Sequence, residues 1–535
     1  MKLKFILAAI LSGVFLSLTW LGFTGLVLLI AFIPLLWVES YFIQHRTTNA
    51  SIAFWWYALI TFFVWNSLTT WWIWHATPIG AVFAIVVNSL LMSIVWWIAH
   101  VAKRNRGDGF GNIFLIFSWI SFEYLHFNWD LSWPWLTLGN GFAKDIYLIQ
   151  WYEYTGVFGG TLWILIMNLM IWTWLKKELI DNQPVHIFQK IIVTGFILVP
   201  GLLSSVIYHS YHEKEDPVQI VISQPNIDPY NDKFTQMPFQ EQYRRLLSMS
   251  DSLGADNIDF FVGPETALHE VWLNNWKYSP PIRTIQNYLK EKYVHSAFVV
   301  GGMSFYEYLY TEKISKTARY NRDSSFIYDA FNSALMITTD GPAGIYHKSK
   351  LVSGVEKMPF KKYLGFLDRM IINLGGTTGT LATLHQPEVF EFKGIKVGVP
   401  ICYESAFGEY SSGFIKNGAE ILMVITNDGW WKNSPGYRQH LTYSQVLAIE
   451  MRRSIARAGN TGISCFINQK GEIEQQTKWW TQTAIKGKIN RNTELTFYAK
   501  NGDFIARISV FMFILMGLTL LVGYIKEYKK RTALY

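Results

Sequence analysis

Three short stretches of the sequence combine residue types that together could carry out acyl-group chemistry. "VPICYES" at 399–405 places Cys402 at the end of an apolar run, with Glu404 two residues beyond. "FVGPETA" places Glu265 after a second apolar run, and "GIYHKSKLV" places Lys348 before a third. A thiolate is a strong nucleophile, a carboxylate can accept the thiol proton, and a lysine can stabilise both the thiolate and a developing oxyanion. The combination indicates acyl transfer through a thioester.

Each of these residues also has an ordinary structural interpretation. An isolated cysteine at a strand end usually packs in a core, a glutamate after Gly-Pro usually belongs to a turn, and a lysine usually reaches solvent. Lys350 competes with Lys348, because the two side chains would share a face in a strand. The second cysteine, Cys465, lies in the apolar run "GISCFIN", where we expect an inert core thiol. The sequence leaves open whether Cys465 and Cys402 form a disulfide, which would block acyl transfer by Cys402.

The segment 212–495, which contains all three stretches, is predicted to form an α/β domain. Its short β-rich runs, such as "VQIVISQPNIDP" and "SAFVVGGMSF", are bounded by Gly, Pro, Asn and Asp. Several runs are continuously apolar, which is typical of strands buried on both faces. Helical stretches such as "HLTYSQVLAIEMRRSIARAG" fall between them. Strands that alternate with helices predict a domain built of layered sheets.

The rest of the chain is predicted to lie in a membrane. Hydrophobic residues make up 50% of the sequence and charged residues 16%, and 24 residues are Trp. Tryptophan and tyrosine favour membrane–water interfaces, because the ring is apolar and its N–H or O–H seeks water. We expect 1–211 to be a membrane domain with about seven transmembrane helices, and 496–535 to be a final transmembrane helix with a basic tail. Eight apolar runs are long enough to cross a bilayer: 4–20, 22–40, 53–74, 79–101, 110–127, 155–175, 188–208 and 503–525.

The distribution of basic residues predicts the orientation of these helices. The start "MKLKFILAAILSG" resembles a signal peptide, but no small-x-small cleavage site closes it, so we favour a retained helix. With a cytoplasmic N-terminus, the short outside loops hold almost no basic residues apart from Lys144, as the positive-inside rule requires. Eight crossings then place both termini in the cytoplasm and 212–495 outside the inner membrane. The basic residues of the inside segments are Lys2, Lys4, Arg46, Lys103, Arg104, Arg106, Lys176, Lys177, Lys190, Lys526, Lys529, Lys530 and Arg531.

Composition argues against several other function classes. The net charge of +8 follows largely from the inside loops, and no basic patch interleaved with aromatic residues suggests a nucleic-acid partner. There is no Cys/His cluster with zinc spacing and no Walker-type loop. We therefore expect no metal, no cofactor and no nucleic acid.

The spaced motifs resemble a known superfamily. The order Glu, Lys, Cys in "GPET", "YHKSKLV" and "ICYE", supported by "SQPNI", by Gly301–Gly302 and by "TNDGWW", is similar to that of nitrilases, the carbon–nitrogen hydrolase superfamily. The resemblance covers about 220–490. It implies an αββα sandwich in which Glu265 is the general base, Lys348 the oxyanion-stabilising lysine and Cys402 the nucleophile.

Nearly the whole chain resembles the membrane-embedded branch of that superfamily, the apolipoprotein N-acyltransferases of bacterial inner membranes. Local support comes from "WPWLTLGN" around Trp135 and from "TFYAKNGD" at 496–503. The resemblance implies that a membrane phospholipid gives its acyl chain to the cysteine. The chain then passes to the α-amino group of the diacylglyceryl-modified N-terminal cysteine of an apolipoprotein. The bilayer is the third implied partner, and we expect a monomer with the catalytic domain on the periplasmic side.

The family also points to supporting residues. Glu404 and Glu356 match acids that the family keeps near the site. The segment "LVSGVEKMP" departs from the Val-Pro-Phe-Gly-Glu of better-known members, which leaves the role of Glu356 open. The backbone N–H of Tyr403 is a candidate oxyanion donor because it follows the nucleophile directly. Asn427 either helps to build the site or is an ordinary turn residue in Asn-Asp-Gly.

Three tryptophans are candidates for contact with lipid. Trp430 and Trp431 could close over acyl chains and exclude water, or could anchor the domain at the membrane interface. Trp135 lies in a predicted outside loop. Glu123, in the fifth apolar run, is a candidate as an acid within a membrane segment, although it lies near the outer end where a carboxylate can reach water.

Two other functions stay open. One is a membrane-bound carbon–nitrogen hydrolase, such as an amidase, in which water hydrolyses the acyl-enzyme. Eight membrane crossings, however, are more than a simple membrane anchor requires. A catalytically inactive lipid-binding or transport protein would keep the fold without the chemistry. The presence of Glu265, Lys348 and Cys402 together argues against the second alternative.

Overall fold

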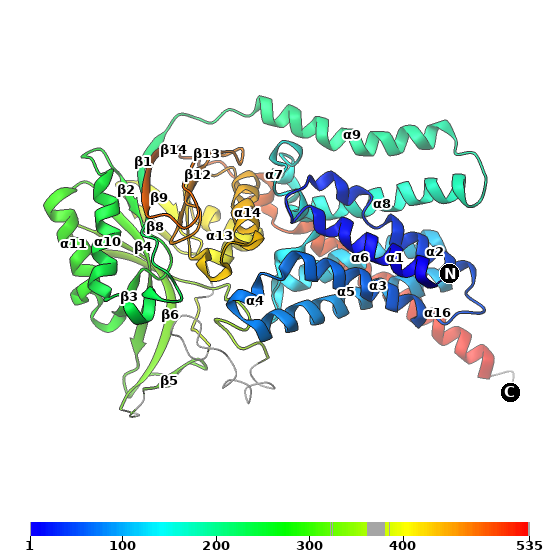
Figure 1. Ribbon diagram of the computed structural model, residues 1–535, viewed down its shortest axis with the longest axis horizontal. Coiled ribbons are helices and arrows are strands. Elements are labelled where there is room, and N and C mark those ends of the chain that lie inside the picture. The colour runs from blue at the N-terminus through cyan, green and yellow to red at the C-terminus, as the bar shows by residue number, and fades with distance from the viewer. Residues whose placement is uncertain (1, 322, 324, 361–379, 385, 533–535) are drawn as a thin grey trace. The chain divides into compact units, whose positions relative to one another are not determined.

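The computed structural model describes residues 2–321, 323, 325–360, 380–384 and 386–532, so positions 533–535 of the expected basic tail lie outside the described residues (Figure 1). The chain forms two compact units. One unit contains residues 1–74, 78–207 and 503–535, and the other contains residues 75–77 and 208–502. Within the described residues, the first unit is helical and the second contains the strands.

Long apolar runs fold into helices in the first unit, because a helix satisfies its own backbone hydrogen bonds without water. Short 3₁₀ segments connect some of them: η1 (Gly25–Leu29), η2 (Pro134–Leu136), η3 (Leu138–Phe142) and η4 (Ile146–Leu148). The helices of the N-terminal part and the C-terminus are α1 (Lys2–Leu18), α2 (Ile33–Gln44), α3 (Ile52–Thr70), α4 (Ile73–Ala76), α5 (Pro78–Arg106), α6 (Asp108–Asn128), α7 (Tyr152–Thr155), α8 (Val157–Leu179), α9 (Ile187–Ser210) and α16 (Phe504–Thr532).

Six helical segments of the described chain are long and apolar enough to cross a membrane: Gly25–Gln44, α3, α5, α8, α9 and Phe504–Lys526. All eight expected runs are helical, but two of them fall outside this set. Helix α1 has only 17 residues, which at about 1.5 Å per residue is shorter than a hydrocarbon core of about 30 Å. Helix α6 carries Glu123 and His126 among its apolar residues. The count of eight crossings therefore stays a prediction.

The second unit contains two sheets. The larger sheet has the order β14-β1-β2-β4-β6-β5, with β3 paired to β4 and β7 paired to β6, and β1, β2 and β4 run parallel. The smaller sheet has the order β13-β12-β11-β10-β9-β8, with β9, β10 and β11 parallel. The strands are β1 (Pro217–Gln224), β2 (Phe260–Val262), β3 (Leu268–Trp272), β4 (Ala297–Glu307), β5 (Arg319–Tyr320), β6 (Ile327–Thr338), β7 (Gly341–His347), β8 (Val389–Phe392), β9 (Ile395–Gly398), β10 (Ile421–Thr426), β11 (Ile455–Gly459), β12 (Cys465–Ile467), β13 (Ile473–Gln476) and β14 (Thr483–Asn490).

Helices cover the outer faces of both sheets, which gives the expected αββα sandwich (Figure 1). One buried cluster joins the two sheets to each other and to α13 and α14, and a second joins the larger sheet to α10 and α11. Strands buried on both faces explain why runs such as "ILMVIT" are continuously apolar. The remaining elements are η5 (Asp232–Gln236), α10 (Phe239–Ser252), η6 (Leu273–Tyr278), α11 (Pro280–Lys292), η8 (Cys402–Ala406), α13 (Gly408–Lys416), η9 (Asp428–Trp431), α14 (Pro435–Met451) and α15 (Phe497–Asn501).

Candidate active site

The three residues singled out for chemistry all follow strands of the sandwich. Glu265 comes three residues after β2, Lys348 directly after β7, and Cys402 begins η8 shortly after β9. Strands β2 and β9 run parallel to their neighbours β4 and β10. The carboxyl ends of parallel strands meet at one edge of a sheet, where the chain leaves regular pairing and its side chains are available for chemistry.

The structure brings Glu265 and Lys348 into direct contact. The Nζ atom of Lys348 lies 3.0 Å from Oε1 of Glu265, and both side chains are buried. The Nδ2 atom of Asn332, in β6, donates to the same oxygen at 2.8 Å, and the backbone N–H of Asn427 donates to Oε2 at 3.1 Å. Burial alone would raise the pKa of Glu265, but the charge of Lys348, the hydrogen bonds from Asn332 and Lys348 and the charge of Lys233 outweigh it and lower the pKa. The carboxylate is therefore held ionised, as a general base requires.

Glu356 also reaches this cluster, although the segment before it departs from the family pattern. Its Oε1 lies 2.9 Å from Nζ of Lys348 and accepts from Asn332 at 3.0 Å, and its Oε2 accepts from the backbone of Val352 at 2.9 Å. Burial would lower the pKa of Lys348, but the charges of Glu265 and Glu356 outweigh it and raise the pKa well above the usual value. Two carboxylates thus keep one buried ammonium charged.

Cys402 is buried at the start of η8 and has a backbone φ of 51°, in the left-handed region that favours glycine. Burial and the charge of Glu265 raise the pKa of its thiol well above the usual value, while Lys348 acts in the opposite direction. The resting cysteine is therefore a thiol next to an ionised acid and a charged lysine. Cys402 and Cys465 are both free cysteines, so the disulfide that the sequence left open is absent.

Glu404 connects the two segments that carry the lysine and the cysteine. Its Oε1 accepts from the backbone of Ser349 at 2.7 Å and from the hydroxyl of Tyr346 at 2.7 Å, while Oε2 accepts from the backbone of Ile401 at 2.8 Å. Its side chain is fully buried. Glu404 therefore acts through its hydrogen bonds on the positions of its neighbours.

The structure separates the two candidate lysines. Lys348 contacts the carboxylates of Glu265 and Glu356, whereas the Nζ atom of Lys350 lies 5.2 Å from the ring centroid of Phe407 and 5.4 Å from that of Tyr410. Residues 348–350 are not in a strand, so Lys348 and Lys350 do not lie on one face of a strand. Tyr403 follows Cys402 in the first turn of η8, where its backbone N–H belongs to the N-terminal end of that turn.

The three tryptophan candidates lie in different surroundings. Trp430 and Trp431 are half-buried in η9. The backbone oxygen of Trp430 accepts from the hydroxyl of Tyr230 at 2.5 Å. Trp135 is in the interior of the helical unit, 1% exposed, with its ring 5.1 Å from that of Trp72.

Glu123 is buried and fully hydrogen-bonded within the helical unit. Its Oε1 accepts from Nε1 of Trp119 at 2.9 Å and from the backbone of Leu138 at 2.8 Å, and Oε2 accepts from Thr161 at 2.7 Å. These partners come from α6, η3 and α8, so the carboxylate joins three elements of the unit. Its contacts are those of a structural residue.

Lys233, which sequence reasoning did not single out, is a second lysine near Glu265. It is buried, and its Nζ lies 3.5 Å from the backbone oxygen of Glu265 and bonds to the hydroxyl of Thr266. Burial lowers the pKa of Lys233 to about 8, against the opposing effect of the Glu265 charge. Thr266 has a φ of 50°, so the turn after the acid is strained. The segment "NDKFTQ" gives no sequence signal for a buried lysine.

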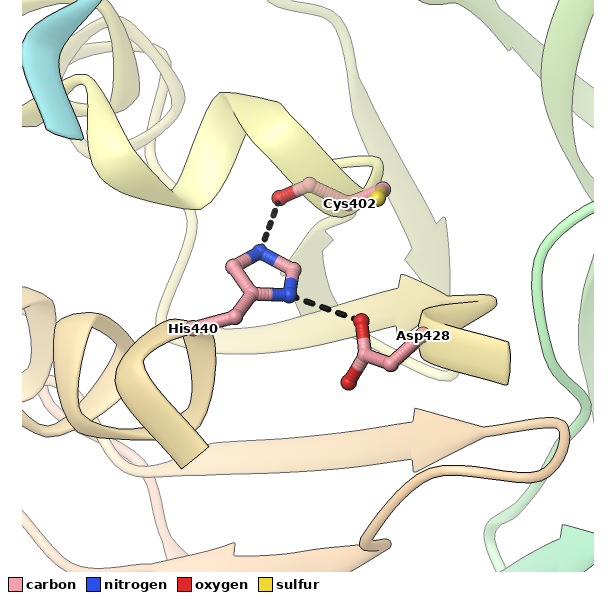
Figure 2. A group of neighbouring side chains, drawn as sticks. All are labelled: Cys402, Asp428 and His440. Atoms are coloured by element: carbon pink, nitrogen blue, oxygen red, sulfur yellow. Dashed lines mark hydrogen bonds and ion pairs between the residues drawn. The ribbon is translucent and has the colours of Figure 1, made fainter. Parts of the chain in front are cut away.

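A further buried group lies beside Cys402 and was also missed. Asp428 and His440 are completely buried, and one ligating atom from each of Cys402, Asp428 and His440 falls within 4.8 Å of the other two (Figure 2). These donor types suit a transition metal. Arg457, however, places its guanidinium 2.7 Å from the second carboxylate oxygen of Asp428, where its charge opposes a bound cation. The available signal was an arginine within the apolar strand "SIARAG".

Comparisons with known proteins agree with this architecture. The family model described as "Carbon-nitrogen hydrolase" matches residues 223–495, and the one described as "Apolipoprotein N-acyltransferase N-terminal domain" matches residues 12–170.

Curated relatives extend the likeness over most of the chain. The Apolipoprotein N-acyltransferase of Chlorobaculum tepidum is 26% identical, over 85% of this chain and 83% of the relative. The protein of the same name from Geobacter metallireducens is 27% identical, over 76% and 74%. That of Thermotoga maritima is 23% identical, over 94% and 91%.

Proposed function

The chain belongs to the carbon–nitrogen hydrolase family, and from that premise we propose that it is a membrane-bound acyltransferase that N-acylates apolipoproteins. It takes the acyl chain from a membrane phospholipid and delivers it to the α-amino group of a diacylglyceryl-modified N-terminal cysteine. One observation carries the proposal: the match to the carbon–nitrogen hydrolase family occurs in the same chain as the match to an apolipoprotein N-acyltransferase N-terminal domain. Relatives named for this activity cover most of the chain.

In the first half-reaction Glu265 takes the proton from the Cys402 thiol, and the thiolate attacks the ester carbonyl of the phospholipid. The developing oxyanion is stabilised by the ammonium of Lys348 and by the backbone N–H of Tyr403. Glu265 then returns the proton to the departing alkoxide, which leaves as a lysophospholipid. The C–O ester bond is exchanged for a C–S thioester bond, and no oxidant or cofactor enters the balance.

In the second half-reaction the α-amino group attacks the thioester carbonyl. Glu265 accepts a proton from the amine, the amide bond forms, and Cys402 leaves as a thiolate that regains the proton. The contacts of Lys348 with Glu265 and Glu356 support this assignment, because they keep a charged donor beside the nucleophile throughout. Asn332 and Asn427 hold Glu265 in place, and Glu404 positions the two segments.

The protein is proposed to be an integral protein of the bacterial inner membrane, as its six apolar helical segments and its relatives suggest. Residues 1–211 and 496–535 form the membrane part, and 212–495 the catalytic domain on the periplasmic side, with both termini in the cytoplasm. This arrangement places the site where two membrane-anchored lipids can reach it. Half-buried Trp430 and Trp431 in η9 are candidates for contact with the acyl chains.

Intact-protein mass spectrometry after incubation with phospholipid tests the proposal. Wild type should gain one acyl-sized mass that hydroxylamine removes, and Cys402→Ala should gain none. Cys465→Ala is the matched control, since Cys465 is the other buried free cysteine, and it should acylate as wild type does. Adding a diacylglyceryl-cysteine peptide should discharge the thioester into an N-acyl peptide. Release of free fatty acid instead would favour a hydrolase, and acylation of Cys402→Ala would refute the nucleophile.

A further inference from the structure

The backbone of Cys402 is strained, and something must hold it. A φ of 51° at a residue with a β-carbon is uncommon, and such a conformation persists only where surrounding contacts enforce it. The carbonyl of Cys402 points toward His440 of α14, whereas its sulfur points away from the ring (Figure 2). Contacts to the carbonyl can therefore enforce the strained conformation, together with the hydrogen bond between Thr426 and the Cys402 side chain.

Two side chains contact that carbonyl oxygen. The hydroxyl of Ser405 donates to it at 2.8 Å, and Nε2 of His440 lies 3.1 Å from it. Nε2 also lies 3.2 Å from the Ser405 hydroxyl oxygen, which has already given its proton to the carbonyl. Both neighbours of Nε2 are therefore acceptors, and the Asp428 carboxylate accepts at Nδ1, so the contacts require the ring to donate from both of its nitrogens.

The other side of the imidazole is fixed by a buried ion pair. Nδ1 of His440 lies 2.8 Å from Oδ1 of Asp428, and the guanidinium of Arg457 lies 2.7 Å from Oδ2. All three side chains are completely buried. Thr426 donates to Asp428 at 2.7 Å, and Trp431 packs edge-on against the ring at 5.5 Å. The ring thus has one orientation, set by residues from η9, β10 and β11.

We propose that His440 is a positioning residue that holds the strained backbone of the nucleophile, with Asp428 and Arg457 fixing its ring. The inference rests on Cys402 being the nucleophile of the proposed function. Without the Nε2 donor, Cys402 relaxes from the left-handed conformation and its thiol leaves the place where Glu265 and Lys348 act on it. His440 is completely buried, so we expect substrate binding to be unaffected.

The test compares His440→Leu with His440→Gln, which keeps a side-chain N–H donor, in the Cys465→Ala background. In single-turnover acylation by phospholipid vesicles, His440→Leu should lower the maximal rate about 100-fold with the apparent KM unchanged, as displaced reacting groups do. His440→Gln should recover at least about tenfold of that loss, since it restores a donor. Ser444→Ala on the same helix is the matched control, because its hydroxyl is buried without a hydrogen-bond partner among the described residues. It should react as the parent does.

Alkylation of Cys402 by iodoacetamide is the second readout and needs no lipid. It should slow by about tenfold in His440→Leu, because thiolate formation depends on the position of the sulfur. A folded His440→Leu with the parent's acylation and alkylation rates would overturn the proposal. If that variant does not fold, His440→Asn decides, since its shorter amide can still reach Asp428 but does not reach the carbonyl: an unchanged rate overturns the inference. A parent enzyme that forms no thioester would refute the proposed function, while the alkylation comparison would still decide the role of His440.

Discussion

At the scale of single residues, the candidate site consists of buried charges that compensate one another. Lys348 lies between Glu265 and Glu356, and the three form a compact ionic group under the sandwich surface. An isolated buried charge is costly, so removing one member leaves the others uncompensated. The neutral thiol of Cys402 is the only member of the proposed triad that must change its charge for reaction to begin.

Replacing Lys348 with methionine should separate the two candidate lysines. Lys348→Met removes the charge that faces both acids and should lower the rate of thioester formation by about 100- to 1,000-fold, as loss of an oxyanion donor does. Lys350→Met removes a charge that lies near the rings of Phe407 and Tyr410 and should leave the rate at the wild-type value. Rapid-quench mass spectrometry measures both. Equal losses in the two variants would contradict the assignment.

Two buried histidines should make the second unit sensitive to acid. Burial lowers the pKa of His347 to about 4, and burial with the charge of Lys233 lowers that of His269 to about 3. Below about pH 6.5 these histidines are protonated in the unfolded chain but not in the folded one. The free energy of unfolding therefore decreases by about 1.4 kcal/mol for each histidine and each unit by which the pH is lowered. The loss should run from about pH 6.5 to about pH 4 for His347 and to about pH 3 for His269.

Thermal unfolding in detergent between pH 7 and pH 5 checks this expectation. The midpoint should fall with pH more steeply in wild type than in His269→Gln or His347→Gln. His212→Gln, at an exposed position, is the control and should show the wild-type slope. Parallel slopes in all four proteins would contradict the expectation.

At the scale of elements, strand ends and the turns after them place the chemistry. Glu265 lies in the turn after β2, and that turn approaches β4 closely at Gly301. A β-carbon at Gly301 would lie 2.5 Å from Cα of Glu265, closer than backbone atoms tolerate. The sequence motif Gly301–Gly302 therefore has a physical reason at Gly301, because a side chain there would collide with the turn that carries Glu265.

Gly301→Ala should therefore displace the acid, whereas Gly302→Ala should not. At Gly302 the closest atom to an added β-carbon is Cδ1 of Leu335 at 2.9 Å, the end of a flexible side chain. We expect each variant to cost about 1–3 kcal/mol of stability by overpacking, but only Gly301→Ala should also lose thioester formation. Acylation rates and thermal midpoints measured on the same preparations check this. Full activity of Gly301→Ala would show that the turn can move without penalty.

At the scale of the whole molecule, the chain combines a helical unit with an αββα sandwich. Six helical segments meet the length and composition needed to cross a membrane. The proposed topology has eight crossings and follows from the basic residues of the inside loops, through the positive-inside rule. An odd number of crossings between the two ends would place the termini on opposite sides.

Labelling of introduced cysteines in spheroplasts checks this topology. Asp130→Cys, in an expected outside loop, should react with a membrane-impermeant maleimide in spheroplasts. Asn49→Cys, in an expected inside loop, should react only after permeabilisation. Both positions are exposed or partly exposed, and the native cysteines are buried. Labelling of Asn49→Cys in intact spheroplasts would reverse or refute the assigned orientation.

The sequence by itself determined the fold class and the identity of the central residues. Continuous apolar runs predicted strands buried on both faces, because side-chain periodicity reflects which faces are covered. The spaced motifs around Glu265, Lys348 and Cys402 indicated the family, and the comparisons confirmed it. The catalytic roles of these residues stay a prediction.

Only the tertiary structure decided which residues surround that centre. Asn332, Lys233 and His440 are distant in sequence from the residues they contact, and single polar residues inside apolar segments do not reveal their partners. The choice of Lys348 over Lys350 as the partner of the acids likewise depends on where β7 ends and which way the following chain turns. Local patterns record which residues are buried, whereas contacts across two packed sheets depend on how the strands are ordered and aligned in space.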